Sequence, residues 1–247
     1  MTASESDPYY RRDLALVHDL GFGRHAEICA PAILALLQPV LEAGGTVLEL
    51  GCGSGLLTQH LVAAGHRVIA TDASPAMLEI ARRSAPQADI RVLVMPHDPM
   101  PPADAVVSIG HGVSYLPDEA AVELALRLAA RALRPGGVYA LDICDLHWGV
   151  HRRDAPNLGR VSDEWAIVTE FSQPTPARYV RQMATFVRND DGTWRRDDER
   201  HDNVLLDTTL VPGWLAEEGV DAAVGTSFGT EELPVGLMTI VGRKRPV

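Results

Sequence analysis

The chain has 247 residues, of which 46% are hydrophobic, and a formal net charge of −11 at pH 7. This length suits a single α/β domain with a small insertion, and the acidic balance argues against a nucleic-acid partner, which requires a basic surface. No run approaches the ~20 apolar residues of a membrane span, and the N-terminus does not have the pattern of a secretory signal, so we expect no membrane partner. The three scattered cysteines argue against a disulfide framework, and we therefore expect a cytoplasmic protein.

The first two thirds of the chain alternate between helical and strand patterns. Residues 9–41 predict two helices, broken at Gly21-Phe22-Gly23, that cover another part of the fold. Short apolar runs and amphipathic stretches then alternate from residue 46 to 145, which is typical of βαβ units with buried parallel strands. The expected strands are 46–50, 67–71, 90–94, 104–109 and 137–142, and the expected helices are 56–64, 74–85 and 118–134.

The pattern changes after residue 145. Runs at 165–171, 179–188 and 194–205, with a turn at 190–192, predict an antiparallel insertion. A helix at 207–218 and closing strands at 220–228 and 235–243 follow. We expect one domain, residues 1–247, with four parts: an N-terminal helical lid (1–44), a core (45–145), the insertion (146–206) and a closing helix with two strands (207–247).

A glycine-rich turn follows the first predicted strand, in the sequence Glu49-Leu50-Gly51-Cys52-Gly53-Ser54-Gly55. The glycines allow a tight turn from strand to helix and let a ligand approach the backbone. A dinucleotide fingerprint has its third glycine five residues after the first, where this chain has Leu56. Glu49 would repel a pyrophosphate but suits a cationic ligand group.

A second acid ends the next predicted strand. Asp72 lies 21 residues after Gly51, and a carboxylate at this position can accept hydrogen bonds from both hydroxyls of a ribose. Ser74 and Pro75 suit the N-cap and first residue of a helix, and Met77 can pack on a flat ring. The turn and the two acids thus predict a site for a cationic, ribose-containing ligand.

These residues resemble the class I S-adenosylmethionine-dependent methyltransferases. The turn and Asp72 match the first two motifs of that family, residues 104–107 resemble its fourth strand, and residues 133–137 resemble the turn before its fifth. The resemblance implies an α/β fold with a Rossmann-like seven-stranded sheet, helices on both faces, a helical N-terminal cover and a small antiparallel β insertion after strand five. It implies S-adenosylmethionine as cofactor and S-adenosylhomocysteine as product.

The resemblance also implies where the cofactor lies, at the carboxyl ends of strands one, two and four. It places residues 97–99 near the adenine ring, and it suggests that the N-terminal cover touches the cofactor through Tyr10. The expected cofactor-binding residues are Tyr10, Glu49, Gly51, Cys52, Gly53, Gly55, Asp72, Ala73, Met77, His97, Asp98, Pro99, Ile109 and Gly110.

His111 is the candidate catalytic residue, because it follows the fourth strand, where the acceptor would meet the sulfonium. A histidine there can take a proton from the acceptor or only orient it, and both roles stay open. The candidate acceptor-pocket residues are Phe22, His25, Tyr115, Trp148 and His201. Residues 108–111 resemble methyltransferases of nucleotide-linked amino sugars, but residues 112–115 depart from them, so the substrate is not carried over.

The sequence thus predicts in-line methyl transfer to a nitrogen or oxygen atom of a small-molecule acceptor, by a monomer or homodimer. Asp142, Asp145, His147 and His151 raise the alternative of a divalent metal, but no octahedral oxygen set is evident and none is expected. The alternative functions are a non-catalytic S-adenosylmethionine-binding or sensing protein and a nicotinamide-dependent oxidoreductase, against which Leu56 and Glu49 argue.

Overall fold

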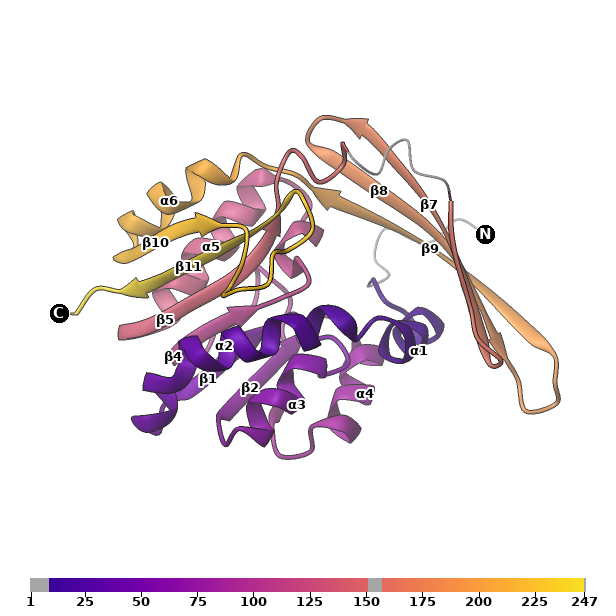
Figure 1. Cartoon of the computed structure of the whole chain (residues 1–247), viewed down its shortest axis with the longest axis horizontal. Coiled ribbons are helices and arrows are strands. Elements are labelled where there is room, and N and C mark those ends of the chain that lie inside the picture. The colour runs from indigo at the N-terminus through magenta and orange to yellow at the C-terminus, as the bar shows by residue number, and fades with distance from the viewer. Residues whose placement is uncertain (1–8, 151–156, 247) are drawn as a thin grey trace.

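The structure is a computed structural model that describes residues 9–150 and 157–246 (Figure 1). In this part of the chain, a central sheet contains β1 (Thr46–Leu50), β2 (Arg67–Asp72), β3 (Asp89–Val92), β4 (Ala103–Ser108), β5 (Leu133–Cys144), β10 (Val220–Gly225) and β11 (Leu237–Lys244). The strand order is β10-β11-β5-β4-β1-β2-β3, and β11 is antiparallel to both of its neighbours. The predicted Rossmann-like seven-stranded sheet is confirmed.

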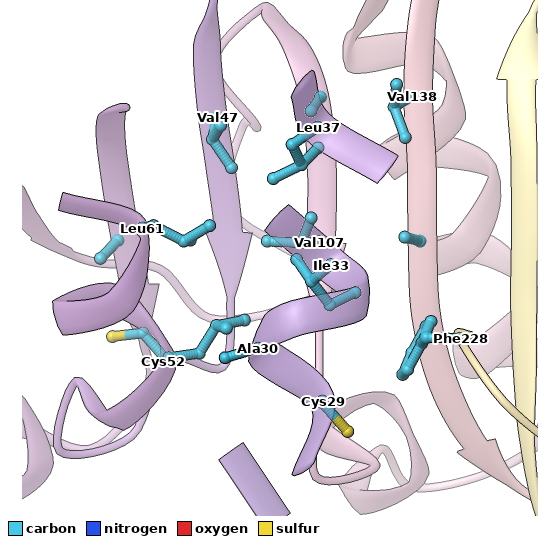
Figure 2. Packing of buried hydrophobic residues seen from close by; sticks show 14 of the residues in the cluster. Cys29, Ala30, Ile33, Leu37, Val47, Cys52, Leu61, Val107, Val138 and Phe228 are labelled. Atoms are coloured by element: carbon cyan, nitrogen blue, oxygen red, sulfur yellow. The ribbon is translucent and has the colours of Figure 1, made fainter. Parts of the chain in front are cut away.

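Helices cover both faces of this sheet, which explains its continuous apolar strands. The helices are α2 (Arg24–Glu42), α3 (Leu56–Ala63), α4 (Pro75–Ser84), α5 (Glu119–Ala132) and α6 (Val211–Glu217). Val47 and Val107 point to the face of α2 and α3 (Figure 2), whereas Leu48 and Val106 pack with α5 and α6. Successive side chains of a strand point to opposite faces, so each strand contributes to both cores.

The N-terminal segment contains α1 (Arg12–Gly21) and α2, which pack against different parts of the fold. In α2, Ile33 and Leu37 are fully buried against the central sheet, so this helix is part of the core (Figure 2). No single helix of the described residues is long and apolar enough to cross a membrane, and only α1 with α2, bent by 66° at their break, has the necessary length and composition.

A second, antiparallel sheet projects beyond the first (Figure 1). Its strands are β6 (Leu158–Val161), β7 (Trp165–Thr175), β8 (Arg178–Arg188) and β9 (Trp194–Val204). The predicted insertion is confirmed, with β6 as an additional strand that is too short and too exposed to give a sequence pattern. The inner face packs on α1, where Gly21 makes room for Trp165, since a Cβ at Gly21 would lie 2.7 Å from the indole.

Two predicted elements near the C-terminus differ in form from the structure, whereas most of the others differ only in where they begin or end. The helix expected at 207–218 is a 3₁₀ turn, Thr208–Leu210, followed by the shorter α6, because Pro212 provides no N–H and suits only the first turn of an α-helix. The strand expected at 220–228 ends at Gly225, and residues 226–236 form a loop.

Candidate functional site

A cavity of about 1120 Å³ lies between the carboxyl ends of β1, β2 and β4, the helix α1 and the inner face of the β6–β9 sheet. The carboxyl edge of a doubly wound sheet is the usual place for a ligand. The volume slightly exceeds the usual range for small-molecule pockets, roughly 300–1,000 Å³. There is therefore room for a cofactor and a second small molecule side by side.

The turn after β1 forms the floor of this cavity. Gly51 and Gly53 line it and have φ values of 65° and 56°, which glycine adopts without strain. Gly55, with φ of 86°, does not line the cavity. A Cβ there would lie 3.3 Å from the Cα of Ala81, so this third glycine serves the packing of α3 on α4.

Glu49 and Asp72 bring two carboxyl groups to the cavity wall, of which Glu49 is buried and Asp72 is half-buried. Glu49 is 2% exposed and accepts a 2.7 Å hydrogen bond from the hydroxyl of Thr58; burial raises its pKa to about 8. Asp72 accepts bonds from the backbone N–H of Gly53 (2.9 Å) and of Ser74 (2.8 Å), and burial also raises its pKa. Each Asp72 oxygen still has a lone pair to accept a ligand hydroxyl.

The residues after β3 that line the cavity come earlier in the chain than the sequence predicted. Residues 93–95 line the wall with Ala73 and Met77, whereas His97, Asp98 and Pro99 lie outside it. The physical reason is that β3 ends at Val92, and the chain then turns away with the Asp98 carboxylate accepting the Val94 N–H at 2.8 Å.

The turn after β4 carries His111 in a left-handed conformation, with φ of 52°. Non-glycine residues rarely adopt this region, and the turn is held by Asp142 of β5. This fully buried carboxylate accepts the N–H of Gly110 at 2.9 Å and the N–H of His111 at 2.5 Å. Sequence reasoning considered Asp142 only as a metal ligand and missed this role.

The His111 ring lines the cavity next to Tyr115, with which it stacks at 5.6 Å. Its Nδ1 is buried and has no hydrogen-bond partner among the described residues. Burial, helped by the charge of Arg181, lowers the pKa of His111 to about 3. A ring that stays neutral at physiological pH can form a hydrogen bond with the acceptor, so in this state His111 suits orientation better than proton removal.

His25, in the first turn of α2, also reaches Asp142, with 2.7 Å between Nε2 and Oδ2. Burial lowers the pKa of His25, but its hydrogen bonds to Asp142 and Cys29 outweigh this effect and raise the pKa to about 10. The imidazolium and the carboxylate form a pair at the cavity wall. His25 was predicted as an acceptor residue, and it lines the cavity in this paired form.

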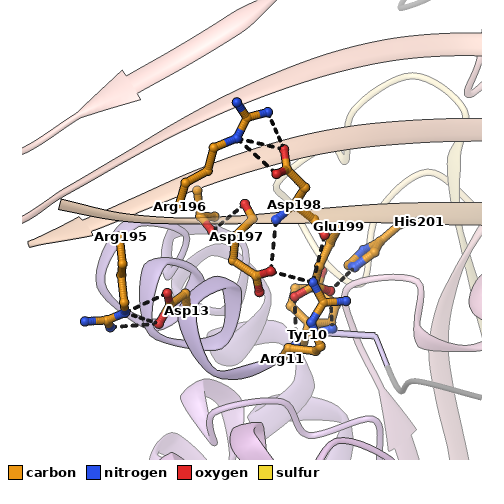
Figure 3. Close-up of polar contacts among 10 residues, drawn as sticks. Tyr10, Arg11, Asp13, Arg195, Arg196, Asp197, Asp198, Glu199 and His201 are labelled. Atoms are coloured by element: carbon orange, nitrogen blue, oxygen red, sulfur yellow. Dashed lines mark hydrogen bonds and ion pairs between the residues drawn. The ribbon is translucent and has the colours of Figure 1, made fainter. Parts of the chain in front are cut away.

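An aromatic cluster forms the side of the cavity beneath the second sheet. The hydroxyl of Tyr10 lies 2.8 Å from that of Tyr115, and both rings pack within 5.4 Å of the His201 ring, between centroids. His201 itself is fully buried behind them, outside the wall, because its Nε2 is held 2.9 Å from Glu199. Glu199 also accepts the N–H of Tyr10 and of Arg11, as Figure 3 shows, and so anchors the start of α1.

Phe22 and Trp148 line the cavity as predicted for the acceptor pocket. Phe22 stacks on His18, with 5.7 Å between ring centroids, and Trp148 contacts the His111 ring at 5.7 Å. His18 escaped sequence reasoning, although its spacing of four residues from Phe22 on a helix was a usable signal. Burial lowers the pKa of His18 to about 4.

The structure brings most of the predicted site residues together in one wall. These are Tyr10, Phe22, His25, Glu49, Gly51, Cys52, Gly53, Asp72, Ala73, Met77, Ile109, Gly110, His111, Tyr115 and Trp148. The predicted residues outside the wall are Gly55, His97, Asp98, Pro99 and His201.

In the described part of the chain, no group of three His, Cys, Asp or Glu side chains is placed to hold a metal ion. Asp142 is engaged by His25, and Asp145 contacts the exposed His147. His151 lies outside the described residues.

Comparisons with known proteins agree with this geometry. Residues 47–137, which include the glycine turn and Asp72, match the family described as "Methyltransferase domain". A putative methyltransferase of Geobacillus sp. (strain WCH70) is 25% identical over 197 residues, 76% of this chain and 78% of that protein. Alignments with further curated methyltransferases span less than half the length of those proteins.

Solved structures share the fold over nearly the whole length of this chain. The sugar N-methyltransferase KedS8 from Streptoalloteichus sp. has a TM-score of 0.77 at 21% identity, covering 99% of both chains. The amino pentose methyltransferase CalS10 from Micromonospora echinaspora, solved with bound S-adenosylmethionine, has a TM-score of 0.71 at 18% identity, covering 98% of this chain and 100% of that one. At these identities the likeness shows the fold. Residues 47–137 thus match a methyltransferase domain, and the chain has the Rossmann-like fold of S-adenosylmethionine-dependent methyltransferases.

Proposed function

We propose that this enzyme transfers the methyl group of S-adenosylmethionine to a nitrogen or oxygen atom of a small-molecule acceptor, and that both molecules bind in the cavity described above. One observation carries the proposal. The glycine turn with Glu49 and Asp72 occupies one end of the same cavity whose other end is formed by His111 and the aromatic cluster. A cofactor in the turn would therefore face an acceptor beside His111.

The turn fits the cofactor in size, shape and charge. Gly51 and Gly53 let a ligand lie close to the backbone, and Asp72 has acceptor capacity left for two ribose hydroxyls. Glu49 faces the cavity as a buried acid, which suits a cationic amino group. Met77 and Leu93 are buried and apolar, and they suit a purine ring. When bound, S-adenosylmethionine supplies an electrophilic methyl group on a positively charged sulfur.

The protein groups around the acceptor would align it and keep water out. Methyl transfer depends mainly on placing the acceptor atom in line with the methyl group and the sulfur. The neutral ring of His111 can accept a hydrogen bond from the acceptor, and its turn is fixed by Asp142. Residues of α1 and of the β6–β9 sheet line this end, which supports a small-molecule acceptor.

Calorimetry with S-adenosylhomocysteine tests the cofactor site. We expect tight binding to the wild-type protein and a loss of at least about 10-fold in Asp72→Ala, because charged hydrogen bonds to the ribose are removed. Asp89→Ala is the matched control, since Asp89 lies on the neighbouring strand and pairs only with the exposed Arg91. Binding of NADH, or equal affinities in the two variants, would refute this assignment.

A further inference from the structure

The acceptor end of the cavity contains an arginine that has no acidic partner among the described residues. Arg181, on the inner face of β8, donates a hydrogen bond from Nη2 to the hydroxyl of Tyr115, and its guanidinium carbon lies 5.7 Å from the centre of that ring. Nη2 also lies 3.5 Å from Nδ1 of His201, at the limit of a hydrogen bond. Its Nε is buried without a partner, and no described carboxylate forms an ion pair with it.

The other two arginines of the cavity wall are paired. Arg11 lies 2.7 Å from the carboxylate of Asp197, and Arg200 lies 2.9 Å from that of Asp202. The carboxylate nearest along the hydrogen-bond chain from Arg181 is Glu199, which the neutral ring of His201 separates from it. A charged side chain withdrawn from water is normally paired with an opposite charge. The positive charge of Arg181 has no such counterpart at the acceptor end of the cavity among the described residues.

The surroundings of Arg181 do not supply this anion. Burial raises the pKa of Tyr115, so the hydroxyl that accepts the Arg181 hydrogen bond is neutral. Burial lowers the pKa of the three histidines near Arg181, His18, His111 and His201, with the charge of Arg181 as the second cause for each. His25 is neutralised by its own partner, Asp142. The positive charge of Arg181 is thus felt throughout this end of the cavity.

We propose that Arg181 binds an anionic group, a carboxylate or a phosphate, on the methyl acceptor. The planar guanidinium presents several N–H groups that match the oxygens of such a group. This inference rests on the proposed function, because it places the acceptor beside His111 with its acid group toward β8. The substrate class is a small amine or alcohol that also carries an acid.

The bound anion would also raise the pKa of His111. Arg181 contributes to the lowered pKa of His111, so an anion that neutralises Arg181 raises that pKa again. The correct acceptor would then bring His111 closer to the range in which it takes up a proton. An acceptor without an acid group would leave His111 in its neutral, weakly basic state.

The experiment uses protein saturated with S-adenosylhomocysteine, with acetate, inorganic phosphate and neutral acetamide as probes at constant ionic strength. We expect acetate or phosphate to bind measurably and acetamide, which has the shape of acetate without its charge, to bind at least about 10-fold more weakly. The stronger of the two anions identifies the acid group of the acceptor. This comparison needs only the wild-type protein, so it does not depend on whether a variant folds.

Variants then assign the binding to one residue. We expect Arg181→Met to lose anion affinity by at least about 10-fold and Arg181→Lys to lose less, since lysine keeps the charge without the planar fork. Arg188→Met is the matched control on the same strand, where the side chain is exposed and pairs with Glu164. The inference would be overturned if neither acetate nor phosphate bound more tightly than acetamide, or if the stronger of the two anions bound equally to the Arg181→Met and Arg188→Met proteins. Failure of the wild type to bind S-adenosylhomocysteine would instead refute the proposed function.

Discussion

His25 of α2 and Asp142 of β5 form an ion pair, with 2.7 Å between Nε2 and Oδ2, directly behind the turn that carries His111. The same carboxylate accepts the backbone N–H groups of Gly110 and His111. One buried group therefore connects the N-terminal helices, the central sheet and the proposed acceptor-orienting residue. Since His111 adopts a left-handed conformation, the position of its ring depends on these bonds.

Replacing Asp142 by asparagine tests this connection. We expect Asp142→Asn to lower the free energy of unfolding by about 1–3 kcal/mol, because a donor is left without its charged partner. Turnover should fall while the affinity for S-adenosylhomocysteine changes little. Urea unfolding and calorimetry measure the two effects. The control is Asp145→Asn, whose partner His147 is exposed and whose loss should cost about 0.5 kcal/mol. A stable, fully active Asp142→Asn protein would contradict the proposed role.

The same pair predicts how stability depends on pH. The pKa of His25 is about 10 in the folded protein against 6.5 for an ordinary histidine, so the folded state holds a proton that the unfolded state releases. The stabilisation is complete below pH 6.5 and is lost as pH rises from 6.5 to 10. Urea unfolding of wild type and His25→Gln across this range should show a stability difference that shrinks with rising pH. A constant difference would disprove the pairing.

The sequence could predict the sheet and the cofactor turn because both depend on local patterns. The spacing of Glu49, Gly51 and Asp72 follows directly from how one βαβ unit folds. The acceptor end depends on contacts between distant segments, such as His25 with Asp142 and Arg181 with Tyr115, which no local pattern encodes. The remaining differences between the predicted and observed cavity wall arise where strands end. Because β3 ends at Val92, residues 93–95 line the cavity in place of the predicted residues 97–99.

Because the pKa of Glu49 is raised, we predict that cofactor binding releases a proton from this residue. Burial raises its pKa to about 8, so near pH 7 it is mostly protonated in the free protein. A cationic amino group beside it favours the ionised form, and binding would then expel the proton. The affinity for S-adenosylhomocysteine should rise by up to about tenfold per pH unit below pH 8 and level off above it. Calorimetry at pH 7 in two buffers of different ionisation enthalpy measures the released proton directly.

Glu49→Gln should remove most of this pH dependence, because glutamine cannot ionise. Asp72 also has a raised pKa, so Asp72→Asn is the comparison that assigns the proton to one carboxyl group. If binding to wild type is independent of buffer and pH, Glu49 does not meet a cation and the cofactor lies differently.

His111→Ala tests orientation of the acceptor. We expect turnover to fall by at least about 10-fold, since misplacing a reactant by a fraction of an ångström is costly. The affinity for S-adenosylhomocysteine should stay within about threefold of wild type, as the ring faces the acceptor end. His111→Gln keeps a hydrogen-bonding group and should recover part of the activity. If His111 acted as a base, this variant would stay inactive, because glutamine cannot take up a proton. Wild-type turnover of His111→Ala between about pH 6 and 9 would eliminate any role for this side chain.

Helix α2 gives the last prediction, which concerns whether the N-terminal segment is a lid or part of the core. Ile33 is fully buried against the central sheet, so Ile33→Ala should lower the free energy of unfolding by about 2–5 kcal/mol. Leu20→Ala, on α1 with 59% of the residue exposed, should cost no more than about 0.5 kcal/mol. Urea unfolding of the two variants compares them directly. Nearly equal, small losses would mean that α2 leaves the sheet easily, as a mobile lid does. A large loss confined to Ile33→Ala would restrict any opening motion to α1. The contacts of α1 with the second sheet include the ion pairs of Asp13 with Arg195 and of Arg11 with Asp197 in Figure 3 and the packing of Trp165.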